Sequence, residues 1–137
     1  MPAVLLIDDE EHCTKLVELL LYGTEFHLLC ASSGAVAIDL LEKHSAEIVC
    51  ILLDIVLPDI NGLDLMRDIH DFIIDNNIPV IIQTSILSYV EIEAFYILGI
   101  SGYLIKPYSR KELLDIINSV TLGNVRTLNK DYIEQEV

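Results

Sequence analysis

The chain of 137 residues, 53% of them hydrophobic, is long enough for one buried core and too short for two independent ones. Its 22 acidic and 8 basic side chains give a formal net charge of −14 at pH 7, which disfavours direct contact with nucleic acids or anionic membranes. There is no apolar run long enough to span a bilayer and no charged leader, so we expect one cytoplasmic domain.

Short apolar runs alternate with segments of helical periodicity along the chain. The runs predict strands over residues 4–7, 26–31, 48–53, 80–84 and 103–105. Runs 26–31 and 48–53 are nearly all apolar, which is typical of strands covered on both faces. With right-handed crossovers, the alternation predicts an α/β fold in which a five-stranded parallel sheet carries helices on both faces.

Apolar residues at helical spacing predict a helix after each strand. In the fourth helix this spacing makes Val90, Ala94, Ile97 and Leu98 the expected buried face. The sequence Ser109-Arg110-Lys111-Glu112 is typical of a capping box that opens the fifth helix.

Polar residues follow the predicted strands where each one ends. Asp8 and Asp9 follow the first strand, Asp54 ends the third, Thr84 ends the fourth, and Lys106 follows the fifth. Because the carboxyl ends of parallel strands border the crevice in which doubly wound sheets bind ligands, these residues predict one site. Its acidic groups predict that it holds a cation.

The same residues make the chain resemble a receiver domain of the response-regulator family, from Val4 to about Leu122. The matching features are the acidic pair, Asp54 with Pro58 and Gly62 four and eight residues later, Thr84, and the run Gly-Tyr-Leu-Ile-Lys-Pro at 102–107. The resemblance implies a flavodoxin-like fold with strand order 2-1-3-4-5 and a cis Lys106-Pro107 bond. It also implies a receiver domain over 1–122, followed by a tail or the start of a linker over 123–137.

The residue types suit acceptance of a phosphoryl group by Asp54. A carboxylate and a phosphoryl donor are both anionic, so a hard cation such as Mg²⁺, or Mn²⁺, is needed to bring them together. We expect Asp9 and Asp54 to bind it directly and Asp8 to act largely through water. The resemblance adds the backbone carbonyl of Val56 as a ligand. Lys106 and the Thr84 hydroxyl would stabilise the phosphoryl oxygens.

The resemblance also implies a switch and partners. A histidine kinase or phosphotransfer protein would supply the phosphoryl group, Thr84 would move inward, and Tyr103 would turn into the vacated space. The surface of the fourth helix, fifth strand and fifth helix would then change, with Tyr89, Tyr96 and Tyr108 as aromatic anchors. This surface would contact a downstream protein target or a fused effector, or form a homodimer.

Other functions fit the residues less well. A haloacid-dehalogenase-like phosphatase would need a second aspartate two residues after Asp54, where this chain has Val56. A flavodoxin-like cofactor binder would place phosphate beside the four acids at 8–11, which would repel it. A receiver-like interaction module that takes no phosphate stays open as an alternative. We expect no enzymatic turnover beyond self-phosphorylation and slow autodephosphorylation, because Val56 and Ile86 would keep water from Asp54.

The remaining reactive side chains are expected to have structural roles only. Cys13, Cys30 and Cys50 lie in apolar stretches at wide spacings, which predicts buried free thiols. The histidines lack the spacing of a metal site; they are His12, His27, His44 and His70.

Overall fold

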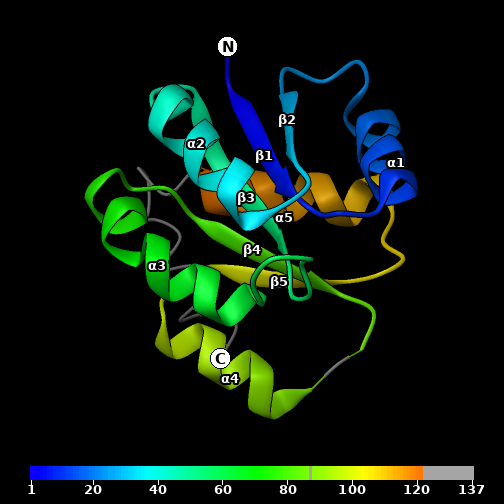
Figure 1. Ribbon diagram of the computed structural model, residues 1–137. Coiled ribbons are helices and arrows are strands. Elements are labelled where there is room, and N and C mark those ends of the chain that lie inside the picture. Colours follow the sequence, from blue (N-terminus) through cyan, green and yellow to red (C-terminus); the bar gives the residue numbers. More distant parts are fainter. Residues whose placement is uncertain (87, 122–137) are drawn as a thin grey trace, which may run out of the picture.

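The computed structural model describes residues 1–86 and 88–121, in which five strands and five helices alternate (Figure 1). The predicted tail or linker at 123–137 lies outside the described residues. The strands are β1 (Ala3–Ile7), β2 (His27–Ala31), β3 (Ile48–Asp54), β4 (Val80–Thr84) and β5 (Gly102–Ile105). The helices are α1 (Glu11–Leu21), α2 (Gly34–His44), α3 (Gly62–Asp75), α4 (Tyr89–Ile97) and α5 (Arg110–Thr121).

The strands form one parallel sheet in the order β2-β1-β3-β4-β5, which confirms the predicted fold class. Its register places Ile7 beside Leu53, Asp54 beside Gln83, and Thr84 beside Ile105. The carboxyl ends of β1, β3, β4 and β5 therefore lie next to one another at one edge.

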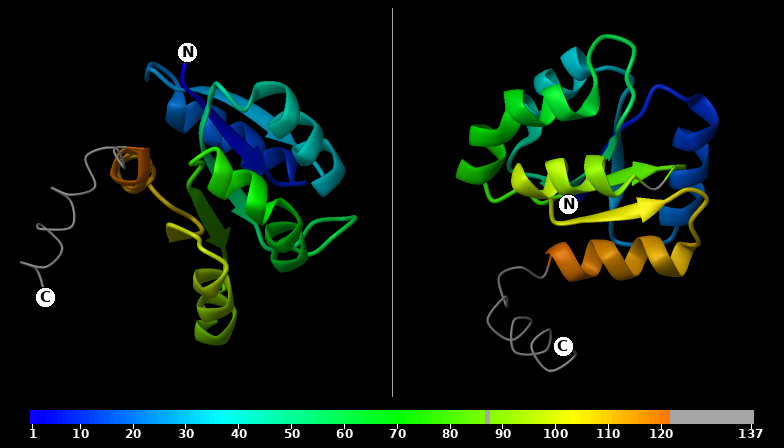
Figure 2. Two further views of the ribbon diagram at one scale, coloured as in Figure 1. Left: turned by 90° about the vertical axis from the view of Figure 1, so that its left-hand side faces the viewer. Right: turned by 90° about the horizontal axis from the view of Figure 1, so that it is seen from below.

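Helices cover both faces of the sheet, with α1 and α5 on one side and α2, α3 and α4 on the other (Figure 2). Alternate side chains of each central strand enter opposite layers, as the period of two requires. In β1, Val4 and Leu6 pack with α1 and α5, whereas Leu5 and Ile7 pack with α2 and α3. Burial on both faces explains the continuous apolar run, because every residue of β1 is buried.

The second strand departs from the prediction. Phe26 lies outside β2, and the strand is mostly half-buried, with Cys30 exposed. Strand β2 is at the edge of the sheet, so its apolar composition did not mean full coverage. The prediction of buried thiols was wrong for Cys30 and right for Cys50, where burial raises the pKa to about 12; Cys13 is only partly buried.

Helix α4 turns a different face inward from the predicted one. Ile92 and Phe95 are buried, whereas Val90 and Ile97 are each 79% exposed. The helix is apolar on nearly all sides, so its periodicity does not select a face. Packing against the sheet and α3 decides the orientation.

The capping box sets the start of α5 as predicted. At α5 the Ser109 hydroxyl accepts from the Glu112 amide at 3.1 Å, and the Glu112 carboxylate accepts from the Ser109 amide at 3.1 Å.

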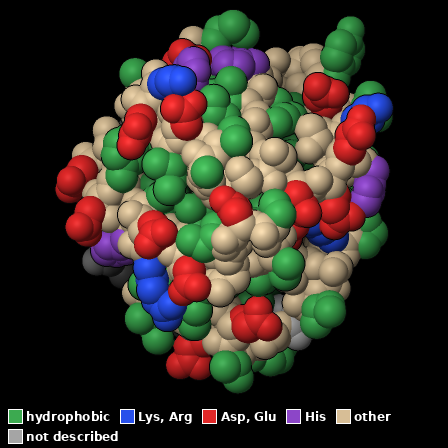
Figure 3. All heavy atoms as spheres, viewed as in Figure 1, with side chains coloured by type: hydrophobic (Ala, Val, Ile, Leu, Met, Phe, Trp, Pro, Cys, Tyr) green, Lys and Arg blue, Asp and Glu red, His purple; other side chains and the backbone are tan. Residues whose placement is uncertain are grey.

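No helix among the described residues is long and apolar enough to cross a membrane. Acidic side chains are spread over the face in Figure 3, and basic ones are few.

Candidate functional site

A cleft lies at the carboxyl edge of the sheet, where the predicted site residues meet. Asp54 from β3, Thr84 from β4 and Lys106 after β5 line it together with residues of the segment between β1 and α1. A second cleft at the opposite edge is bordered by Asn76 and Pro79, and no acidic or basic side chain is among its described lining residues. The first cleft is therefore the candidate site.

Asp8 is the centre of the polar contacts in the cleft. Its carboxylate accepts hydrogen bonds from the Lys106 ammonium at 3.0 Å, the Gln83 amide at 2.9 Å and the Glu10 backbone amide at 2.9 Å. The Asp8 side chain is fully buried, so these contacts replace the water that its charge has lost. They hold the carboxylate in one orientation.

Asp54 lies at the end of β3, with its carboxylate 3.9 Å from the Lys106 ammonium. Burial raises the pKa of Asp54 to about 6; the Lys106 charge opposes this shift and the Asp8 charge adds to it. Two carboxylates share one lysine, which leaves excess negative charge at this point. A divalent cation would compensate that charge.

Lys106 is held by contacts on both its backbone and its side chain. Its amide donates to the Thr84 carbonyl at 2.7 Å, and the Lys106-Pro107 bond is cis, as the resemblance implied. Burial lowers the pKa of Lys106, but the hydrogen bond to Asp8 and the charges of Asp54 and Asp8 raise it more. The net pKa lies above its ordinary value. Lys106 is therefore a fixed positive charge.

The segment after Asp54 folds back on itself. The Gly62 amide donates to the Ile55 carbonyl at 2.6 Å, and Val56 pairs with Asn61 in an isolated bridge. A Cβ at Gly62 would lie 2.9 Å from the Ile55 Cα, so a glycine is needed for α3 to begin this close to Asp54. The fold-back leaves the Val56 side chain 71% exposed at the cleft.

The structure groups the acidic residues differently from the expectation. Asp8, Glu10 and Asp54 each offer a carboxylate oxygen within 4.8 Å of the others. Asp9 lines the cleft with an exposed side chain and is outside this group among the described residues. Direct binding of a metal by Asp9, and indirect binding by Asp8, remain predictions. Glu10 belongs to the acidic run at 8–11, but the sequence analysis did not predict it to be a metal ligand.

Among the described residues, neither predicted switch residue forms a hydrogen bond with Asp54. The Thr84 hydroxyl donates to the Ile86 carbonyl at 2.8 Å and accepts from the Ile86 amide at 3.1 Å. Tyr103 is 37% exposed on β5. Their roles in switching remain predictions, and Thr84 would first have to exchange its bonds to Ile86.

Tyr108 and Gln83 form a buried pair that the sequence analysis missed. The prediction that Tyr108 is a surface anchor was wrong: it is 8% exposed and its hydroxyl donates to the Gln83 side-chain carbonyl at 2.6 Å. Burial, followed by the Asp8 charge, raises the pKa of Tyr108 above its ordinary value. Gln83 itself could have indicated this pair, because it is a polar residue in the otherwise apolar run 80–83 and therefore needs a buried hydrogen-bond partner.

Comparison with known proteins gives a match to one family over most of the chain. The family model described as "Response regulator receiver domain" matches residues 4–118. The chain is 32% identical to the transcriptional regulatory protein CpxR of Escherichia coli, over 88% of the chain and 49% of CpxR. The chain spans less than two thirds of the length of such curated relatives.

Solved structures agree with this match. A response regulator receiver domain protein from Clostridium thermocellum superposes with a TM-score of 0.80 at 26% identity, covering 93% of this chain and 98% of that one. A complex of CheX with CheY, BeF3 and Mg²⁺ from Borrelia burgdorferi gives a TM-score of 0.79 at 25% identity. That match covers 87% of this chain and 88% of the other.

Proposed function

This chain belongs to the receiver domain family of two-component response regulators, and on that premise we propose that Asp54 accepts a phosphoryl group in a reaction that depends on Mg²⁺. The observation that carries the proposal is the position of the Asp54 carboxylate, 3.9 Å from Lys106 and beside Asp8 and Glu10. A nucleophilic carboxylate, a fixed cation and oxygen ligands for a metal thus border one cleft.

The residues present fit a hard divalent cation. Mg²⁺ takes oxygen ligands in octahedral geometry and keeps several waters, so two carboxylates and one carbonyl suffice. Asp9 and Asp54 would supply the carboxylates and Val56 the backbone carbonyl, with Asp8 acting through water; Mn²⁺ would serve as well. The bound cation would offset the repulsion between Asp54 and the phosphoryl donor.

Lys106 and Thr84 would bind the transferred group. The Lys106 ammonium is held by Asp8 and would contact one phosphoryl oxygen without rearrangement of the backbone. Thr84 would give up its hydrogen bonds to Ile86 and turn its hydroxyl toward another oxygen. Transfer to Asp54 would therefore alter the loop between β4 and α4.

The surface of α4, β5 and α5 is the proposed output of this change. The Tyr103 ring would move into the space left by Thr84. It would thereby withdraw from a surface that carries exposed apolar side chains. These are Tyr89, Val90, Tyr96, Ile97 and Ile105. Such a surface suits a protein target, a fused effector or a second receiver.

The phosphoryl donor would be a histidine kinase or a phosphotransfer protein. The relative CpxR is named a transcriptional regulatory protein. We propose that this chain likewise serves as the input of a response rather than as an enzyme. Its own acidic balance of 22 acids to 8 bases disfavours direct binding of nucleic acid by the receiver.

Acetyl phosphate with Mg²⁺ tests the proposal, with intact-mass spectrometry as the readout. One phosphoryl group is expected on the unaltered chain and none on Asp54→Asn. Asp71→Asn is the matched control, because Asp71 is an exposed aspartate on α3, and it should be modified fully. Full modification of Asp54→Asn would refute Asp54 as the acceptor. No modification of the unaltered chain would favour the alternative of an interaction module that takes no phosphate.

A further inference from the structure

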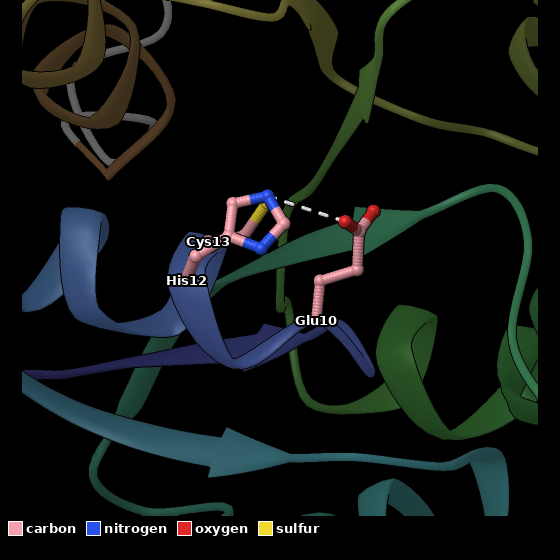
Figure 4. Close-up of side chains that lie close together, drawn as sticks. All are labelled: Glu10, His12 and Cys13. Carbon is pink, nitrogen blue, oxygen red and sulfur yellow. Dashed lines mark ion pairs between the residues drawn. The ribbon is translucent and has the colours of Figure 1, made fainter.

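Three different ligand types meet where α1 begins. Glu10, His12 and Cys13 each offer one ligand atom within 4.8 Å of the others, and Figure 4 shows them close together. The His12 Nε2 atom lies 3.2 Å from a Glu10 carboxylate oxygen. We propose that these residues form a second metal site, for a zinc-class transition metal ion, at the rim of the Asp54 cleft.

The donor set distinguishes this site from the one beside Asp54. Carboxylate, imidazole and thiolate are the ligands that Zn²⁺ takes, and three protein ligands leave the fourth tetrahedral position to water. Mg²⁺ prefers oxygen and gains nothing from sulfur or nitrogen. The neighbouring group of Asp8, Glu10 and Asp54 offers oxygen alone. The two groups therefore suit different metals.

A metal ion has access to the proposed site. The His12 and Glu10 side chains are 80% and 49% exposed, whereas Cys13 is partly buried. All three residues line the cleft. Glu10 makes no capping hydrogen bond through its side chain, so metal binding would not cost α1 its N-cap. Cys13 would bind as a thiolate, and its proton would pass to water.

Metal at this site would act on the Asp54 cleft through two contacts. Lys106 donates to the Cys13 sulfur at 3.7 Å, and Glu10 belongs to both ligand groups. A bound ion would occupy the sulfur and the Glu10 carboxylate and place positive charge beside Lys106. We therefore expect Zn²⁺ to slow phosphorylation of Asp54; this effect, unlike binding itself, rests on the proposed function.

Cobalt(II) is the probe for binding, because a cobalt–thiolate bond gives a charge-transfer absorption band. The full chain, reduced and free of metal, should develop the band in proportion to one ion per chain. Cys13→Ser should abolish it, and His12→Gln should weaken binding by more than roughly 10-fold, since even outer partners of a metal contribute about that much. Zn²⁺ should displace Co²⁺ and remove the band.

Two matched variants separate this site from other thiols and histidines. Cys30→Ser removes the exposed thiol of β2, and His70→Gln removes a histidine of α3; both should retain the cobalt band. A band that survives Cys13→Ser, disappears in Cys30→Ser or never forms would refute the site. A band that is unaffected by His12→Gln would refute the three-ligand set.

The effect on phosphorylation is measured separately, with acetyl phosphate at saturating Mg²⁺ and increasing Zn²⁺. For each protein, the rate with Zn²⁺ is compared with the rate of the same protein without Zn²⁺. The Zn²⁺ concentration that halves the rate should be more than roughly 10-fold higher for His12→Gln than for the unaltered chain. Equal inhibition of both proteins would show that zinc acts at the oxygen ligands instead, and would refute the regulatory role. If Asp54 accepts no phosphate at all, the cobalt band still decides whether the metal site exists.

Discussion

The Tyr108 hydroxyl donates a 2.6 Å hydrogen bond to the side-chain carbonyl of Gln83, and both residues lie in the core. The Gln83 amide in turn donates to Asp8 at 2.9 Å. This chain of bonds joins the end of β1 to the segment that opens α5. Asp8 also accepts a hydrogen bond from Lys106, so the orientation of these two charged side chains in the cleft depends on the buried Gln83 and Tyr108.

Tyr108→Phe should lower the free energy of unfolding by about 1–3 kcal/mol, because it leaves the Gln83 carbonyl buried without a donor. Urea unfolding measures the change. Tyr89→Phe is the control, since Tyr89 is 78% exposed, and it should leave stability nearly unchanged. Equal stability of the two variants would contradict a contribution from the bond.

Mg²⁺ should raise the melting temperature by mass action, because the proposed metal site would exist only in the folded chain. Asp9→Ala should remove most of this shift, and Glu10→Gln should remove less. Thermal unfolding with and without Mg²⁺ measures both. The reverse order would make Glu10, which lies beside Asp54 in the structure, the principal ligand in place of Asp9.

Autodephosphorylation should be slow, because the Val56 and Ile86 side chains border the cleft and have no group to orient water. They are 71% and 75% exposed, so substitution should not disturb the core. Replacing Val56 with Asn and Ile86 with Glu should speed the loss of phosphate by about 10-fold, or ~1.4 kcal/mol of barrier. Time courses of phospho-Asp54 decay decide this. A fast parent that the double substitution leaves unchanged would contradict control by these positions.

Asp59 should contribute stability that depends on pH. Its carboxylate accepts from the Gly34 and Ala35 amides at 2.9 and 3.1 Å, and these bonds, that of Gly34 first, lower its pKa below the ordinary 3.8. Because the pKa of Asp59 is lower in the folded chain than in the unfolded chain, its carboxylate stabilises the fold at pH values above the pKa of the unfolded chain. This contribution is lost as the pH falls through the pKa of the folded chain. Asp59→Ala should therefore lower stability at neutral pH, and by less below pH 3.8.

Urea unfolding at a series of pH values measures this difference. Asp68→Ala, which removes an exposed aspartate within α3, is the control for the loss of a surface carboxylate. An Asp59→Ala deficit that is constant across the series would contradict the ionic origin of the effect.

The inward face of α4 can be tested directly. Phe95→Ala should cost about 3–5 kcal/mol because Phe95 is 1% exposed in the core. Ile97→Ala should change stability by no more than about 0.5 kcal/mol, because Ile97 is 79% exposed. Urea unfolding of the two variants compares the faces. A larger loss for Ile97→Ala would restore the face predicted from periodicity.

Local sequence was sufficient for the elements and for the edge at which the site lies. Apolar runs predicted all five strands to within one or two residues, and the capping box predicted the start of α5. Asp54 and Thr84 were placed correctly at strand ends because each is a polar residue that follows an apolar run. These signals depend only on neighbouring residues, so they can be read along the chain. The order of the strands came from the family resemblance.

Tertiary packing decided what composition left open. Apolar content did not reveal that β2 is an edge strand or which side of α4 faces the core, because a uniformly apolar segment has no preferred face. Nor did it reveal that Tyr108 is buried against Gln83, or that Glu10 lies beside Asp54. Asp8 and Lys106 are 98 residues apart in sequence, and their contact exists because the parallel sheet places the carboxyl ends of β1 and β5 at the same end of the sheet. Contacts of this kind depend on how separate elements pack, which no local pattern specifies.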